Sequence, residues 1–241
     1  MKIVLFSLFN LFFLQSSFSQ SMENNSLTDL QVKNAIQLYN QFTDGNAPIY
    51  NGPQYIYYNF KMEGNPYFIS GDYSKGWVGY NGRVYEPVSM FYDIARNQLV
   101  ILNADGITNI EMHNEFVDSF HLWGHTFISL KEDQKQNLYN TGFYDLLYNG
   151  NIQLLARRIK TFQDNIQNLV VVRVFYNGDR FYIHKDGIYY LVSNKKDVFH
   201  LFADKIHDIK KMMRKKHLKL RRNTFESSLE QVTAFYDQLI H

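Results

Sequence analysis

The most distinctive chemical feature of the sequence is the basic stretch Lys195–Arg222, which contains eleven lysines and arginines and three aspartates. The rest of the chain from Gln20 onward holds thirteen basic and twenty acidic side chains, so charge is strongly polarised along the sequence. A basic amphipathic helix in this stretch predicts contact with an anionic membrane surface or a soluble polyanion. The alternative is a solvated outer face on which Asp208 pairs locally with Lys211. The candidate contact residues are Lys210, Lys211, Arg214 and Lys215.

The sequence contains no complete signature of a catalytic or metal-binding motif. The serine nucleophile elbow, the HExxH zinc pattern, the GxGxxG dinucleotide loop and the P-loop are all absent. The lack of cysteine excludes disulfide scaffolds, cysteine nucleophiles and thiolate-held zinc or iron–sulfur sites. His113–Glu115 resembles the His-x-Glu motif of zinc deaminases, but the cysteines that this motif requires are missing. We therefore expect no catalytic residue, no metal site and no cofactor.

The two histidines closest in sequence that could share a metal are His121 and His125. If Trp123-Gly124 is a two-residue turn, His125 faces Leu122 across it and His121 projects from the opposite face of the hairpin. This geometry separates the two imidazoles. We therefore expect ordinary hairpin residues here.

The alternative function is a secreted glycan-active hydrolase. Such an enzyme requires two carboxylates that the fold brings close together. Asp93, Asp145 and Glu86 are candidates for a general acid and base pair, although nothing in their spacing brings any two together. Aromatic residues make up 17% of the chain and are interpreted mainly as strand side chains that fill a wide β core. The aromatic candidates for stacking on sugar rings are Tyr55, Tyr57, Trp77 and Trp123.

The first nineteen residues are typical of a secretory signal peptide. Lys2 supplies the charged start, Ile3–Leu14 the apolar core, and Ser17 and Ser19 suit cleavage before Gln20. The core is shorter than the roughly 20 apolar residues that cross a bilayer, so no transmembrane span is expected. We expect export to the periplasm or the extracellular space and, because no cysteine can carry a lipid, a protein that is not a lipoprotein. The expected partner is an anionic envelope component or another protein, and no nucleic acid is expected.

Four Tyr-Asn-Gly steps punctuate the chain, and the Asp-Gly steps at Asp105-Gly106 and Asp186-Gly187 act similarly. Both residues of such a step readily adopt the positive φ of a type I′ turn, so most of these steps predict β-hairpins. The expected strand sets are Trp77–Tyr80 with Arg83–Tyr92; Leu99–Leu102 with Ile107–Met112; Phe120–Trp123 with His125–Leu130; Phe143–Tyr148 with Ile152–Arg158; and the series Val170–Tyr176, Phe181–His184 and Ile188–Val192.

Further patterns describe individual strands. Tyr55–Met62 alternates in the manner of a strand, and Pro87 predicts an edge or a bulge because it lacks a ladder donor. Leu169–Tyr176 and Ile188–Val192 are apolar on both faces, which predicts central strands covered on both sides.

These elements predict a mainly β (α+β) fold. An antiparallel meander of about 10–12 strands in residues 46–194 would form a barrel, a half-barrel or a sandwich. Residues 20–45 are expected to contain an N-terminal helix, and residues 195–241 a basic C-terminal helical hairpin packed on the β domain. Apolar spacings of three and four from Phe199 to Met213 predict the first helix of the hairpin. Asn223-x-x-Glu226 predicts the capping box of the second.

Six short runs spread over nearly all of the chain after the signal segment carry a family resemblance. They are Gly79–Val88, Tyr92–Ile94, Leu99–Ile101, Gly142–Tyr148, Leu155–Arg158 and Ala234–Asp237, the last of which closes the Lys-rich helical end. Together they resemble a family of exported Bacteroidota proteins of unknown function. The resemblance implies export in a bacterium with a Gram-negative envelope. Its motifs are turns and helix patterns, so it implies no activity. We therefore expect a non-catalytic binding or scaffold protein of the cell envelope.

Overall fold

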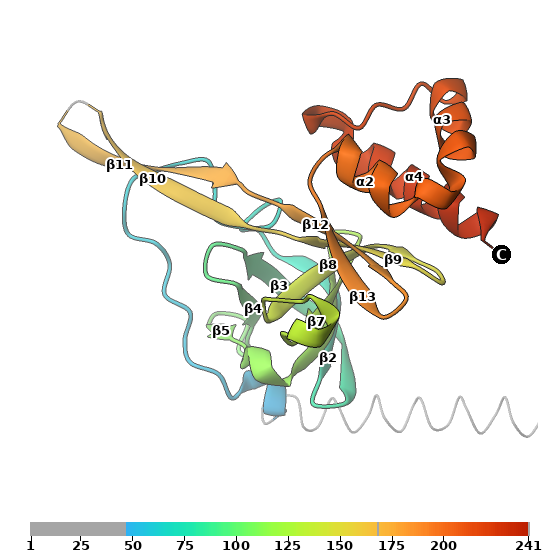
Figure 1. Cartoon of the computed structure of the whole chain (residues 1–241). Coiled ribbons are helices and arrows are strands. Elements are labelled where there is room, and N and C mark those ends of the chain that lie inside the picture. Colours follow the sequence, from blue (N-terminus) through green and yellow to red (C-terminus); the bar gives the residue numbers. More distant parts are fainter. Residues whose placement is uncertain (1–46, 168, 241) are drawn as a thin grey trace, which may run out of the picture. The chain divides into compact units, whose positions relative to one another are not determined.

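The computed structural model describes residues 47–167 and 169–240 (Figure 1). The expected signal peptide, residues 1–19, and the expected N-terminal helix within residues 20–45 lie outside the described residues. The described part is mainly β, with thirteen strands and three α-helices, which confirms the predicted β-rich fold with a C-terminal helical hairpin. The strands are β1 (Met62–Glu63), β2 (Ser74–Tyr80), β3 (Arg83–Asp93), β4 (Gln98–Leu102), β5 (Asn109–Glu111), β6 (Val117–Leu122), β7 (His125–Leu130), β8 (Gly142–Asn149), β9 (Gln153–Arg157), β10 (Lys160–Gln167), β11 (Val170–Asn177), β12 (Arg180–Lys185) and β13 (Ile188–Val192).

Ten of the strands form one antiparallel sheet in the order β13-β12-β9-β8-β7-β6-β2-β3-β4-β5. The two end strands, β13 and β5, do not pair with each other in the described residues, so the sheet does not close on itself. A second sheet has the order β1-β11-β10, and in it the short β1 runs parallel to β11. Figure 1 shows the β10–β11 hairpin extending away from the ten-stranded sheet.

Three of the expected tight turns are confirmed by backbone geometry. Asn81-Gly82, Trp123-Gly124 and Asp186-Gly187 all have positive φ at both residues, as a type I′ turn requires. They join β2 to β3, β6 to β7 and β12 to β13 with the expected registers. Pro87 is also explained, because Gly76 opposite Val88 is followed by Val78 opposite Tyr85, which leaves a bulge in β3.

Three other expectations about turns and strands are wrong. Asn177-Gly178 does not join a hairpin: β11 pairs with β10, a strand that the sequence patterns did not single out, and β12 pairs with β9. Tyr55–Met62 is not a strand apart from Met62, and the hydroxyls of Tyr55 and Tyr58 in this segment donate hydrogen bonds to Asp93. Of the two segments expected to be central and covered on both sides, β13 instead ends its sheet. β11 is the central strand of the three-stranded sheet, as expected, but it exposes several apolar side chains and so is not covered on both sides.

Asp105-Gly106 does not form a type I′ turn, because only Gly106 of this pair has a positive φ. The loop is instead held by the side chain of Asp105. The Asp105 carboxylate accepts hydrogen bonds from the hydroxyl and amide of Thr108 and from the amide of Ile107. These bonds favour the charged form and lower the pKa of Asp105 to about 2.

We expect a carboxyl titration followed by NMR to show a midpoint for Asp105 near pH 2, well below the ordinary value of 3.8. Because the folded-state pKa is depressed, the stabilisation is present above about pH 4 and is lost as the pH falls toward 2. Replacing Thr108 by valine removes the hydroxyl donor and should raise the midpoint. A midpoint that does not move in this variant would contradict the assignment.

The C-terminal segment forms α2 (Lys195–Leu201), α3 (Ile206–Lys215) and α4 (Phe225–Leu239). The single helix expected through Phe199–Met213 is interrupted by a 3₁₀ turn at Ala203–Lys205. The capping box expected at Asn223 and Glu226 is absent, since Thr224 precedes the helix without a side-chain cap. A complete capping box instead begins α2.

The helices pack on one end of the ten-stranded sheet, beside β8, β9 and β12 (Figure 1). Their apolar side chains form one buried cluster with strand residues, which removes apolar surface from water. Asp237 of α4 fixes this contact, because its carboxylate accepts hydrogen bonds from the Tyr148 hydroxyl and from the amides of Asn151 and Ile152.

Candidate anion-binding site

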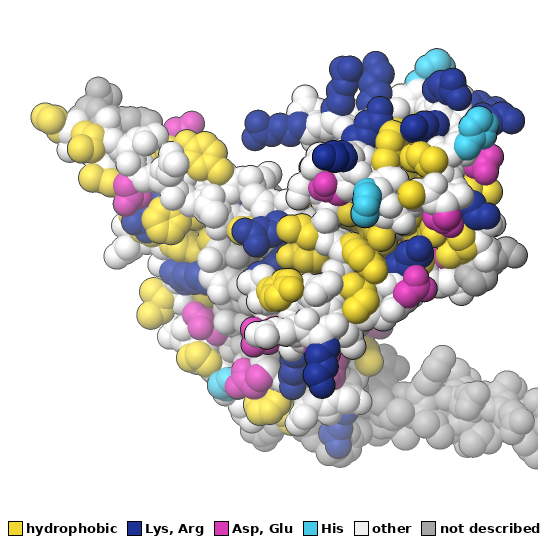
Figure 2. Space-filling model, in the orientation of Figure 1, with side chains coloured by type: hydrophobic (Ala, Val, Ile, Leu, Met, Phe, Trp, Pro, Cys, Tyr) yellow, Lys and Arg dark blue, Asp and Glu magenta, His cyan; other side chains and the backbone are white. Residues whose placement is uncertain are grey.

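Most of the cationic side chains of the helical segment are exposed, because its apolar side chains pack in the buried cluster. In α2, the Asn194 side chain accepts hydrogen bonds from the amides of Lys196 and Asp197, and the Asp197 carboxylate accepts one from the Asn194 amide. In α3, Ile209, Met212 and Met213 are buried. The cations on the opposite side of the helix are exposed: Lys210, Lys211, Arg214 and Lys215. Figure 2 shows Lys and Arg side chains gathered over α2 and α3.

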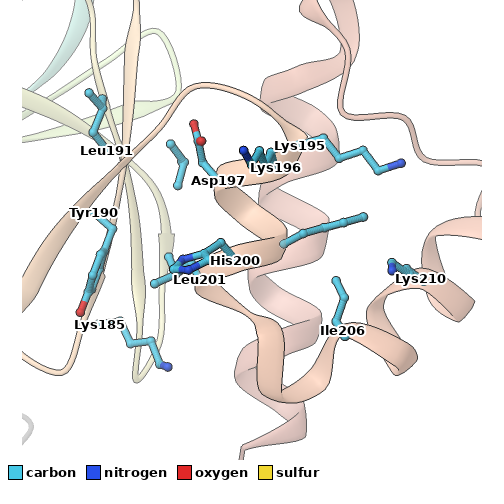
Figure 3. A pocket seen from close by; sticks show the side chains of 12 residues that line it. Lys185, Tyr190, Leu191, Lys195, Lys196, Asp197, His200, Leu201, Ile206 and Lys210 are labelled. Carbon is cyan, nitrogen blue, oxygen red and sulfur yellow. The ribbon is translucent and has the colours of Figure 1, made fainter.

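A hollow of about 1240 Å³ lies where α2 and α3 meet β12 and β13. Its cationic lining comes from four lysines, Lys185, Lys195, Lys196 and Lys210, and its acidic lining from Asp197 alone. The Asp197 carboxylate is already engaged by the backbone that precedes α2. Figure 3 shows the strand residues on one side of this hollow and the helix residues on the other. The lining of the hollow therefore carries more cations than anions.

A second hollow of about 500 Å³ adjoins the first and shares Lys195, Phe199 and Lys210 with it. Arg214 and Lys219 complete its cationic lining, and no acidic residue lines it. Four cations around an opening of this size favour an anionic group.

Phe199 is the aromatic element shared by the two hollows. The Nζ atoms of Lys195 and Lys210 lie 5.0 and 5.4 Å from its ring centroid, within the range of cation–π attraction. The Phe199 ring thus contacts one lysine of α2 and one of α3 without neutralising either charge.

The four cations of the second hollow have no carboxylate partner among the described residues. Within that part of the chain, no ion pair shorter than 4.0 Å includes Lys195, Lys210, Arg214 or Lys219. Lys185 differs, since its Nζ lies 3.8 Å from the carboxylate of Asp186. The unpaired charges are the part of the surface that can attract an anion.

The four residues that the sequence singled out are all exposed on α3. Lys210 lines both hollows and Arg214 the second, whereas Lys211 and Lys215 line neither. Sequence reasoning did not single out Lys195 and Lys219. The signal for Lys195 was Asn194-x-x-Asp197, a capping-box pattern that begins a helix at that lysine.

The candidate carboxylates do not form an acid and base pair with one another. Asp93 is buried and accepts hydrogen bonds from Tyr55 and Tyr58, and Glu86 is exposed on β3. Asp145 is buried and bound by Arg158.

Arg158 gathers three carboxylates around one guanidinium. Its Nη2 lies 2.6 Å from Asp145 and 2.8 Å from Glu226, and its Nη1 lies 2.9 Å from Asp179. Burial lowers the pKa of Arg158, but Glu226 and Asp145 outweigh that effect and hold the pKa above its ordinary value. The cluster is an ion-pair network that joins α4 to the sheet.

The histidine and aromatic candidates have local roles. As expected, Leu122 faces His125 across the turn, and the two histidines have different partners, Thr126 for His121 and Asp145 for His125. No group of three or more potential metal-ligating side chains is found in residues 47–167 and 169–240. The sugar-stacking candidates differ in exposure: Tyr55 is buried, Tyr57 and Trp123 are exposed, and Trp77 stacks on His121.

We compared the chain with protein-family models, with curated proteins and with solved structures. Nothing matched. The assignment of the site therefore depends on its geometry and charge. In the described part of the chain, no helix combines the length and the apolar character needed to cross a membrane.

Proposed function

We propose that the protein is a non-catalytic, exported binding protein of the cell envelope that holds an anionic ligand between α2 and α3. The observation that carries this proposal is the second hollow, where four cations meet and no acid lines the opening. We do not propose the glycan hydrolase, because its candidate carboxylates are bound by arginine or tyrosine, or lie apart on an exposed strand.

The chemistry of the lining indicates an anion with an apolar or ring-shaped part. The cations suit phosphate, sulfate or carboxylate groups, and Phe199 offers a partly exposed ring between two lysines. Tyr190 and Leu191 of β13 add exposed apolar surface to the larger hollow. Anionic glycans and lipid headgroups share these properties.

The proposed location is supported by the sequence alone. The pattern of residues 1–19 is that of a secretory signal peptide, and the chain resembles exported Bacteroidota proteins. An anionic envelope component is the partner that fits both the location and the charge of the site.

The test compares two variants that lose the same number of charges. The site variant carries Lys195→Gln, Lys210→Gln, Arg214→Gln and Lys219→Gln. The control variant carries Lys211→Gln, Lys215→Gln, Lys216→Gln and Arg222→Gln, none of which lines either of the two hollows described above. Binding of fluorescent dextran sulfate and of phosphatidylglycerol vesicles is measured between low and physiological salt.

We expect the site variant to bind at least one of these probes about 1000-fold more weakly, since its four cations contribute about 1 kcal/mol each near an anionic surface. The control variant should stay within about fivefold of the wild type. Preference for the polymer over the vesicles would indicate a glycan, and the reverse a headgroup. Equal losses in both variants, or no binding by the wild type at low salt, would refute the site.

A further inference from the structure

The distal end of the β10–β11 hairpin exposes a group of large apolar side chains. Leu169 is 98% exposed, Ile166 78%, Val171 57% and Val170 48%. Figure 2 shows hydrophobic side chains at this end of the hairpin. Such a group on the surface of a folded protein indicates contact with something apolar.

Leu169 is not explained by the needs of the turn or of the core. Its φ of 64° lies in the left-handed region, where glycine and asparagine are preferred and an ordinary side chain is strained. Its side chain contributes nothing to the protein interior because it is almost fully exposed. An exposed leucine in this conformation indicates a contact with something outside the protein.

The last charged residues before this apolar group are Asp164 and Arg173. Asp164 and Arg173 lie opposite each other on β10 and β11 and form two hydrogen bonds, of 2.8 and 3.0 Å. Beyond this pair, from Asn165 to Val172, the sequence contains no charged residue. The end of the hairpin can therefore leave water without desolvating a charge.

The apolar side chains are distributed over both faces of the hairpin. Ile166 pairs with Val171 on one face, whereas Val170 occupies the next register position and so lies on the other. Leu169 precedes Val170 at the start of β11. A groove on a protein would cover one face, but lipid can surround all of these side chains.

We propose that the distal end of the β10–β11 hairpin inserts into the interfacial region of a lipid bilayer. This goes beyond the anionic ligand of α2 and α3, because it requires no charged lipid. Leu169 lies four positions before Arg173, so the apolar end reaches about 13 Å beyond the last charged pair.

Insertion is shallow because β10 is an edge strand in the described residues. The backbone groups on its free side cannot enter hydrocarbon without losing their hydrogen bonds to water. The hairpin therefore anchors the protein at the membrane surface and does not cross the bilayer.

The experiment uses vesicles of phosphatidylcholine, which carry no net charge, with the whole protein. The hairpin variant carries Ile166→Ser, Leu169→Gly and Val171→Ser, in which glycine relieves the positive φ. The control variant carries Ile56→Ser, Val84→Ser and Ile107→Ser, three equally exposed apolar residues elsewhere. Circular dichroism melts verify that both variants fold.

We expect the wild type and the control variant to cosediment with the vesicles in a salt-independent manner, and the hairpin variant to bind at least 10-fold more weakly. The four-glutamine site variant described above should still bind, which separates the two proposals. A Leu169→Trp reporter should show a blue-shifted emission that brominated lipids quench.

Lack of vesicle binding by the wild type, or an unshifted reporter, would overturn the proposal. Light scattering tests the competing occupant, a second copy of the chain paired along β10. If the hairpin substitutions convert a dimer to a monomer and leave vesicle binding unchanged, the hairpin is a dimer interface and the lipid proposal is wrong.

Discussion

Replacing Arg158 by methionine is expected to lower the free energy of unfolding by about 3–5 kcal/mol. Asp145 is fully buried and would lose the guanidinium that now pairs with it, which leaves His125 as its side-chain hydrogen-bond partner. Asp179 and Glu226 are partly exposed and can be solvated by water, so the loss comes chiefly from Asp145. Urea unfolding followed by circular dichroism measures the change.

Arg173→Met is the matched control, because Arg173 also binds a carboxylate through two hydrogen bonds but does so on the exposed hairpin. Exposed pairs contribute less than about 1 kcal/mol, so this variant should remain close to the wild type. Adding Asp145→Asn to Arg158→Met should recover much of the lost stability, since it removes the uncompensated charge. Similar losses in the two arginine variants would show that burial of the network does not matter.

Replacing Phe202 by alanine is expected to cost about 3–5 kcal/mol, the range for deleting a large buried aromatic side chain. Phe202 is completely buried and its ring stacks on Tyr236 of α4, with centroids 4.0 Å apart. The substitution leaves a cavity between the end of α2 and α4. The midpoint of thermal unfolding and the urea-derived free energy measure the effect.

Phe199→Ala is the control, since Phe199 lies one turn earlier on α2 but is only partly buried. It should lose distinctly less stability than Phe202→Ala. Because Phe199 lines both hollows and contacts Lys195 and Lys210, its removal should instead weaken binding of the anionic probes several-fold. The reverse pattern would show that Phe199 is a core residue and that Phe202 is not.

Turns could be predicted from sequence where the whole interaction is local. Asn81-Gly82 and Asp186-Gly187 adopt positive φ because two residues and their adjacent strands decide the conformation. Asn177-Gly178 has the same local chemistry, but β11 has a better partner in β10. Pairing between strands is a competition among distant segments, which a dipeptide cannot reveal.

The exposed cationic face of α3 could be predicted because helical periodicity is also a local property. The two hollows could not be predicted in this way. Periodicity places Lys210 and Arg214 on the exposed side of α3. Lys185 comes from β12, and Lys219 from the loop after α3, and only tertiary packing brings them to the same site. The exposed end of the hairpin was also missed, because residues that are apolar on both faces usually indicate a buried strand.

Asp237 and Glu226 of α4 impose an order of events on folding. Glu226 binds Arg158 from 68 residues away, and Asp237 binds Tyr148 from 89 residues away. During synthesis, β8 and β9 therefore emerge long before the groups that complete their contacts. Closing such long loops is entropically slow, so we expect the C-terminal end of the sheet to acquire its native packing only after α4 has been synthesised. We expect a nascent chain that still lacks α4 to remain loosely structured there, a state that a chaperone can bind.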